Sequence, residues 1–155
     1  MKIVNDPEYI DGLRVVQDSE EIAKALGKCE TVMHWELGDS MTPIINNAEY
    51  CKIKRVTDLR EIKVGDAVFC KVNGYYMVHQ VVCISDSGHD GRLWFKIGST
   101  DGTIFGWTQE VLGHAYGTDI YQCEEVIERT LEAYRKAKDE AYAMAKEQLF
   151  NAFIS

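Results

Sequence analysis

A serine in a predicted turn is the first residue of this sequence that could do chemistry. Ser40 stands between Gly38 and Pro43, directly after a strand-like run, where a small residue and a proline favour an exposed tight turn. A free serine hydroxyl hardly ionises at neutral pH, so a nucleophilic serine needs a base within about 2.6 to 3.2 Å. On local chemistry alone, an ordinary turn serine that bonds its own backbone is the favoured interpretation.

His79 is the best candidate for the base that such a serine needs. It lies in a strand-like run whose alternation places Met77, His79 and Val81 on one face. A polar ring among apolar neighbours requires a hydrogen-bond partner. Taken alone, a histidine in this position is more often a satisfied core or surface residue than a base.

Strand-like runs separated by turn residues fill the middle of the sequence, from about residue 31 to residue 121. Asn73-Gly74 is a strong two-residue hairpin signal, because both positions tolerate the positive φ that this turn requires. The pattern predicts a mainly β, antiparallel body. The predicted strands cover residues 31–37, 49–56, 67–72, 75–85, 93–97 and 113–121.

Helical patterns flank this body and divide the chain into three zones: 1–30, 31–121 and 122–155. The first zone is an acidic lead in which Asp18 caps a helix of about two turns that stops at Gly27. The last zone contains no Gly or Pro between about residues 124 and 152 and predicts one long amphipathic helix. Its apolar stripe comprises Ile127, Leu131, Tyr134, Ala141, Ala145 and Leu149.

The apolar stripe of the C-terminal helix needs a surface to cover it. Packing on the chain's own body is the favoured interpretation, because amphipathic surface helices usually face their own core. A homodimer formed through this helix is the alternative.

Composition limits the classes of function. The 155 residues are 46% hydrophobic and 27% charged, as in one ordinary globular domain. Lysine and arginine number 17 against 25 aspartates and glutamates, a net charge of −8, so no nucleic-acid partner is expected. No run approaches the roughly 18 apolar residues of a membrane span, and the N-terminal residues do not resemble a signal peptide.

Cysteine and histidine usage predicts a cytoplasmic protein without a metal or other cofactor. Five cysteines without any Cys-x-x-Cys pair suggest neither a disulfide framework nor a zinc site. The remaining histidines, His34, His89 and His114, lack the short spacing of a metal pair.

Three ordered motifs resemble the signal-peptidase and LexA-type serine peptidase superfamily. The resemblance covers about residues 31–121 and implies a LexA/signal-peptidase-like antiparallel β body, here with a short N-terminal and a long C-terminal helix. The motifs are Gly38-Asp39-Ser40-Met41-x-Pro43, Ile62-Lys63-Val64-Gly65-Asp66 and Val78-His79-Gln80-Val81.

The resemblance implies catalytic roles. In that superfamily the Ser-Met-x-Pro box carries the nucleophile and a downstream strand carries the base, which implies Ser40 as nucleophile and His79 as base. The base is lysine in many members and histidine in archaeal and endoplasmic-reticulum signal peptidases, so this chain resembles a serine–histidine version. Asp101 is the expected acidic third member, which would orient the imidazole; Asp86 and Asp90 remain alternatives.

Two functions from different classes follow. The first is a soluble serine endopeptidase that acts on a peptide or protein substrate. Because neither a membrane anchor nor a DNA-binding domain is found in the sequence, a stand-alone, phage-related member is expected; Ala-Gly and Cys-Gly, the self-cleavage dipeptides of LexA-like proteins, are also absent. The second is a catalytically silent binding or regulatory module that holds a protein partner in the same groove or on the C-terminal helix.

Overall fold

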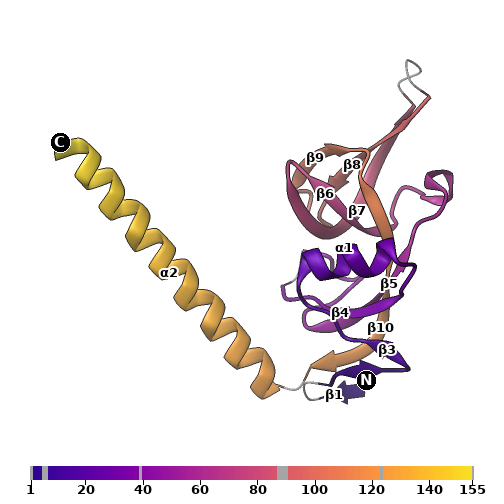
Figure 1. Ribbon diagram of the computed structural model, residues 1–155, viewed down its shortest axis with the longest axis horizontal. Helices are drawn as coiled ribbons and strands as arrows, with labels where there is room; N and C mark the ends of the chain where they lie inside the picture. Colours follow the sequence, from indigo (N-terminus) through magenta and orange to yellow (C-terminus); the bar gives the residue numbers. More distant parts are fainter. Residues whose placement is uncertain (1, 5–6, 39, 87–90, 123, 155) are drawn as a thin grey trace.

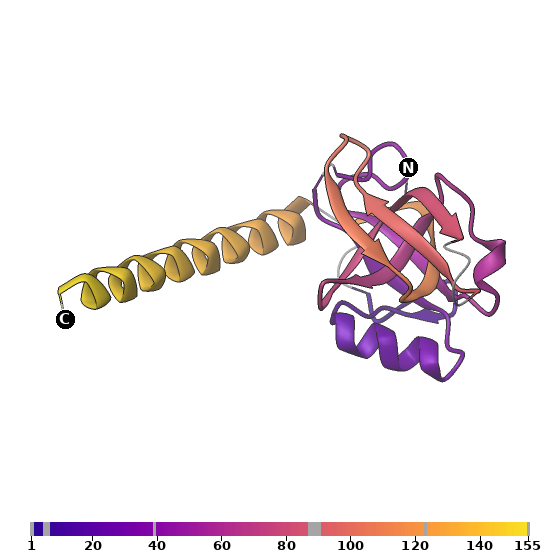
Figure 2. The same cartoon turned by 90° about the horizontal axis from the view of Figure 1, so that it is seen from above.

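Strands dominate the structure, which confirms the prediction of a mainly β, antiparallel protein. The computed structural model describes residues 2–4, 7–38, 40–86, 91–122 and 124–154 (Figures 1 and 2). The elements in chain order are β1 (Lys2–Val4), β2 (Tyr9–Ile10), β3 (Leu13–Arg14), α1 (Ser19–Gly27), β4 (Val32–Trp35), β5 (Glu49–Arg55), the 3₁₀-helix η1 (Leu59–Glu61), β6 (Ala67–Val72), β7 (Tyr75–Asp86), β8 (Leu93–Gly98), β9 (Ile104–Thr108), β10 (Val111–Gln122) and α2 (Glu124–Ile154).

Eight of the described strands form one sheet in the order β4-β5-β10-β6-β7-β8-β9, with β1 added in parallel to β10. The other pairs in this sheet are antiparallel. Strand β10 joins the two halves because it pairs with β5 and with β6, and its register shifts against both partners. Such shifts bend a strand and increase its twist, which lets one sheet enclose more than one core.

The hairpin between β6 and β7 forms where the sequence predicts it. Asn73 and Gly74 both have positive φ, 51° and 86°, as a two-residue hairpin turn of this kind requires. The turn sets a register that pairs Val72 with Tyr75 and Val68 with His79. Residue 79 therefore lies within the sheet rather than at one of its edges.

Alternation along β6 and β7 divides the interior into two main cores on opposite faces of these strands. The first core, which α1 covers, contains Ile22, Leu26, Met41, Ile45, Ile53, Ala67, Phe69 and Val78 among others. The second core contains Ile62, Val68, Cys70, Val72, Val81, Phe95, Ile97 and Val111.

Helix α1 closes the first core and has the cap that the sequence predicts. The Asp18 carboxylate accepts a hydrogen bond of 3.0 Å from the Glu21 N–H, which satisfies one of the free donors at the start of the helix. Ile22, Ala25 and Leu26 are the buried residues of this helix.

Helix α2 confirms the predicted long helix, but the expectation that it packs on the body is wrong. Figures 1 and 2 show α2 leading away from the β body, and all of its side chains that the structure describes are exposed. The stripe residues whose side chains the structure describes, Ala141, Ala145 and Leu149, therefore have no covering surface within the described chain. None of the helices described is long and apolar enough to cross a membrane.

Strand β9 and the short strands β1, β2 and β3 were not predicted from the sequence. Strand β9 begins with Ile104 and contains Gly106, whose φ of 142° is unusual for a strand. Its strand geometry depends on the partner β8, which pairs Phe95 with Thr108 and Ile97 with Gly106. Strand β1 is set by a distant partner, β10, whereas β2 and β3 pair with each other across the turn at Asp11 and Gly12 and are only two residues long.

Candidate functional site

The turn that carries Ser40 is anchored on both sides. Before it, the Gly38 N–H donates to Asn47 Oδ1 at 2.8 Å, and Gly38 has a φ of 102° that favours glycine. After it, the buried Met41 side chain packs into the first core and its carbonyl accepts from the Ile45 N–H at 2.9 Å. Ser40 itself is half-buried, whereas Asp39 of the same motif lies outside the described residues.

A second turn, residues 99–103, holds the backbone of Ser40. The Ser40 carbonyl accepts two hydrogen bonds from Thr100, one from its N–H at 2.8 Å and one from Oγ1 at 3.0 Å. Gln80 donates from Nε2 to the Ser99 carbonyl at 3.2 Å, which ties the same turn to β7 beside His79. The structure thus brings the segments of Ser40, His79 and Asp101 together although they are far apart in the sequence.

The 99–103 turn is tightly built around Asp101. The Asp101 carboxylate accepts from Ser99 Oγ and from the Thr103 N–H, the latter at 3.1 Å. These hydrogen bonds favour the charged form and lower the pKa of Asp101. Gly98 sets the entry to the turn, because an added Cβ would lie 2.7 Å from the Thr103 carbonyl oxygen.

His79 lies half-buried against an aromatic ring. Its imidazole stacks on Phe105 of β9, with ring centroids 4.4 Å apart and planes 25° from parallel. Nδ1 is buried and has no hydrogen-bond partner among the described residues. Burial lowers the pKa of His79, while the negative charges of Glu36 and Asp101 oppose that shift. The ring is therefore biased toward the neutral form, in which one nitrogen can accept a proton.

The three predicted residues are gathered but not directly bonded. Within the described chain, no hydrogen bond joins Ser40 to His79 or His79 to Asp101, and none is donated by the Ser40 N–H. Asp101 acts on His79 through its charge. In unliganded sites, catalytic hydrogen bonds are often long and tighten only when substrate binds.

Asp86 and Asp90 were the alternatives to Asp101 as the acidic third residue. Asp86 lies at the far end of β7, seven residues beyond His79, which corresponds to roughly 23 Å along a strand. It is therefore too distant to orient the imidazole. Asp90 lies outside the described residues.

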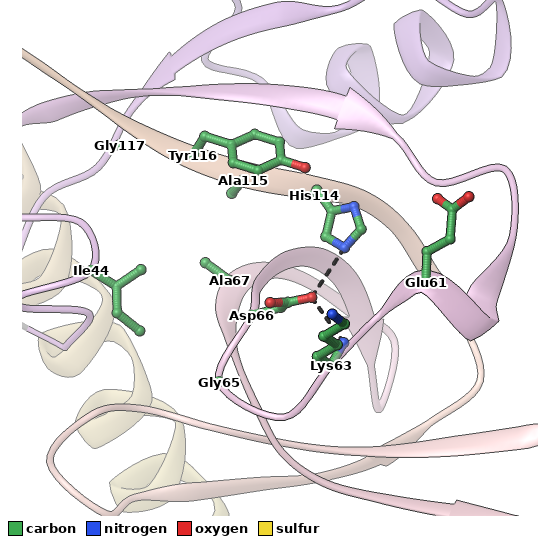
Figure 3. Close-up of a pocket in the computed structure, with 10 residues that line it drawn as sticks. All are labelled: Ile44, Glu61, Lys63, Gly65, Asp66, Ala67, His114, Ala115, Tyr116 and Gly117. Atoms are coloured by element: carbon green, nitrogen blue, oxygen red, sulfur yellow. Dashed lines mark hydrogen bonds and ion pairs between the residues drawn. The ribbon is translucent and has the colours of Figure 1, made fainter.

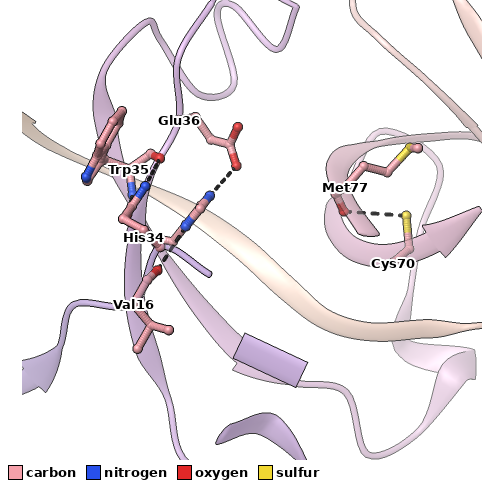
Figure 4. Close-up of polar contacts among 7 residues, drawn as sticks. Val16, His34, Trp35, Glu36, Cys70 and Met77 are labelled. Carbon is pink, nitrogen blue, oxygen red and sulfur yellow. Dashed lines mark hydrogen bonds and ion pairs between the residues drawn. The ribbon is translucent and has the colours of Figure 1, made fainter. Parts of the chain in front are cut away.

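Glu36 is a charged neighbour of His79 that the sequence analysis missed. It follows β4 and precedes the serine turn by four residues, and its Oε1 lies 2.8 Å from His34 Nε2 (Figure 4). His34 is held in turn by a 3.0 Å hydrogen bond between its Nδ1 and the Val16 carbonyl. Of the two carboxylates that act on His79, Glu36 has the larger effect on its pKa. No spacing in the sequence indicates this proximity, because it depends on how the segment after β4 is placed relative to β7.

A pocket of about 500 Å³ opens on the β body (Figure 3). Asp66 lies at its centre, accepting a hydrogen bond from the Lys63 N–H at 2.8 Å and lying 3.3 Å from His114 Nε2. Asp66 is a turn residue, since its own N–H also donates to the Lys63 carbonyl at 3.0 Å. Ile44 lines the pocket and belongs to the segment that follows Ser40, but Ser40, His79 and Asp101 are not among the lining residues.

The buried thiols do not compete with Ser40 as nucleophiles. Burial raises the pKa of the Cys70 thiol to about 12, and its sulfur lies 3.8 Å from the Met77 carbonyl (Figure 4). Burial also raises the pKa of Cys51. Only the thiolate is strongly nucleophilic, so both residues are inert at neutral pH.

Thr100 allows a direct test of the link between the two turns. We expect Thr100→Val to destabilise the fold by about 1 kcal/mol, because it removes one hydrogen bond to the Ser40 carbonyl and keeps the side-chain volume. Thr100→Ser keeps the hydroxyl and should stay close to wild type. Urea unfolding measures both. The control is Thr57→Val, at an exposed threonine; an equal loss there would refute a specific role for Thr100.

Comparisons with protein-family models, with curated proteins and with solved structures found no match to this chain.

Proposed function

We propose that this protein is a serine endopeptidase with a signal-peptidase/LexA-like body, in which Ser40 is the nucleophile and His79 the general base. Support comes from the ordered motifs of the sequence and from the way distant segments converge. The Thr100 hydrogen bonds to the Ser40 carbonyl carry the proposal, because they join the serine turn to the turn of Asp101.

The proposed reaction begins with proton transfer. A neutral nitrogen of His79 takes the hydroxyl proton of Ser40 as Oγ attacks the peptide carbonyl. The carbonyl oxygen becomes an oxyanion, which the Ser40 N–H is free to stabilise. When the C–N bond breaks, the imidazolium returns the proton to the leaving amine and an acyl-enzyme remains. Water, deprotonated by His79, then hydrolyses the ester and restores Ser40.

The surroundings of His79 suit this cycle. Burial keeps the imidazole neutral before the reaction, and Phe105 limits its motion by stacking. Glu36 and Asp101 supply negative charge that stabilises the imidazolium formed during proton transfer. The direct Ser40–His79 hydrogen bond is expected to form when substrate closes the site.

Covalent labelling tests the proposal. We expect a peptidyl diphenyl phosphonate, which reacts with activated serines, to add one adduct per chain, located on Ser40 by tandem mass spectrometry. Ser40→Ala should abolish the adduct while keeping the fold by circular dichroism. Prior alkylation of the exposed Cys29 and Cys83 should leave labelling unchanged. Absence of any adduct across peptide sequences, with Ser40 intact and the protein folded, would count decisively against a peptidase.

A binding module on the same fold is the second candidate. The observation that favours it is the buried Nδ1 of His79, which has no hydrogen-bond partner, Ser40 included, within the described residues. If the protein holds peptides without cleaving them, the Ser40→Ala variant should bind those peptides as tightly as the wild type does. Isothermal titration with a peptide library member that is retained but not hydrolysed would identify this case.

A further inference from the structure

Helix α2 presents a wide apolar face that nothing in the described chain covers. Tyr142 and Leu149 are 70% and 73% exposed, and together with Ala145, Lys146 and Phe150 they line a shallow hollow on the helix. A helix of 31 residues in water gains little stability on its own, since helices in proteins depend on packing of an apolar face. Packing of this face against a partner would therefore stabilise the helix.

The spacing of the apolar positions is symmetric about the middle of the helix. We define the seam as positions 127, 131, 134, 138, 142, 145 and 149, which are apolar except for Lys138. Reversing the helix about position 138 maps the seam onto itself. The spacing repeats every 11 residues, a period that keeps the seam between two helices when they wind with a right-handed supercoil. Two antiparallel copies can therefore pair along the whole seam.

Charges along one edge of the seam favour that arrangement. At about 100° per residue, Glu128, Arg135, Asp139 and Lys146 lie on the same edge, and all four are exposed. In an antiparallel pair, each edge of one helix lies against the same edge of the other helix. Glu128 then faces Lys146 of the second copy, and Arg135 faces Asp139, each pair occurring twice by symmetry. Every contact along this edge joins opposite charges.

The other edge of the seam is uncharged. It includes Ala137, Ala141 and Gln148, and in the antiparallel pair Ala137 meets Ala141 of the second copy. Small residues there let the two backbones approach closely. In a parallel pair the charged edge of one helix would instead meet the uncharged edge of the other, so no ion pair would form.

From this complementarity we propose that α2 forms an antiparallel two-helix dimer with a second copy of this chain, centred near residues 137 and 138. A membrane surface fits the helix less well, because α2 carries seven acidic and five basic residues and lipid-binding helices are enriched in Lys and Arg. Lys138 sits at the centre, where it faces Lys138 of the second copy; such a polar seam residue defines register at some loss of stability. The proposal is independent of the proposed peptidase activity.

Charge exchange in the full chain tests both the dimer and its direction. Sedimentation equilibrium of the wild type should give twice the 17.6 kDa chain mass. Glu128→Lys alone and Lys146→Glu alone should each raise the dissociation constant by about tenfold or more, because two ion pairs become like-charge contacts. An equimolar mixture of the two variants should restore dimers as heterodimers, and Lys138→Leu should tighten the wild-type dimer.

The far face of the helix supplies the control. Glu147→Lys changes the charge by the same amount as Glu128→Lys but lies away from the seam, so dimerisation should be unaffected. A monomer at all concentrations up to the millimolar range would overturn the proposal. A dimer that the single exchanges do not weaken would also overturn it, because a parallel pair has no ion pair along this edge to lose. Failure of the equimolar mixture to restore a weakened dimer would overturn it as well, because Glu128 and Lys146 would then not face each other.

Discussion

We expect replacement of His79 by alanine to slow acylation of Ser40 by roughly 10²- to 10⁴-fold, the usual contribution of a positioned general base. The loss should appear in kcat/KM for a cleaved peptide or in the second-order rate of phosphonate labelling. Because Ser40 and His79 act as one unit, the double variant with Ser40→Ala should be no slower than Ser40→Ala alone. Additive losses would contradict a shared proton-transfer step.

The pH dependence of this reaction follows from the position of the imidazole. Burial lowers the pKa of His79 below its usual value of 6.5. A protonated imidazole cannot accept the serine proton, so the rate should fall as pH decreases through this lowered pKa and stay level above it. The midpoint should therefore lie below 6.5, and a midpoint above that value would refute the assignment of His79 as base.

Neighbouring charges provide a finer check on the same profile. Glu36 and Asp101 raise the pKa of His79 against the effect of burial. Glu36→Gln should therefore move the midpoint further down, and Asp101→Asn should do the same to a smaller extent. His114 is also half-buried, and it lies 3.3 Å from Asp66. His114→Asn should leave the midpoint unchanged.

The largest expected effect on stability is that of Phe95→Ala. Phe95 lies on β8, is fully buried in the second core and packs in the same cluster as Val68, Val81 and Ile97. Removing its ring should destabilise the fold by about 3 to 5 kcal/mol, because the cavity adds to the lost burial. This is a large part of the roughly 5 to 15 kcal/mol that stabilises a typical domain.

Unfolding in urea measures the effect of Phe95→Ala, with Phe95→Leu as a milder variant in case the alanine variant does not fold. Phe95→Leu should lose about 1.5 kcal/mol or less, since most of the apolar volume remains. Tyr75→Ala is the matched control: its ring is 74% exposed, and its loss should stay within about 0.5 kcal/mol. A loss of stability for Phe95→Ala as small as that for Tyr75→Ala would mean that the second core contributes little to stability.

Elements with a strong local signal could be predicted from the sequence. Asp18 supplies the cap of α1, Asn73-Gly74 supplies the turn between β6 and β7, and a long run without Gly or Pro supplies α2. Each depends on residues that are near one another in the chain, so the pattern is visible without the fold. The motif around Ser40 and the strand of His79 belong to the same class of local information.

Contacts between distant segments were decided by the tertiary structure. Thr100 bonds the Ser40 carbonyl across 60 residues, and Phe105 stacks on His79 from a strand that was not predicted. Glu36 acts on His79 because β4 and the serine turn bring it close, which no spacing in the sequence indicates. For α2, the apolar stripe and the charges on its edge are properties of the sequence alone. That the β body leaves the described part of this stripe uncovered depends on where β10 ends and α2 leaves the sheet, and only the folded chain determines that direction.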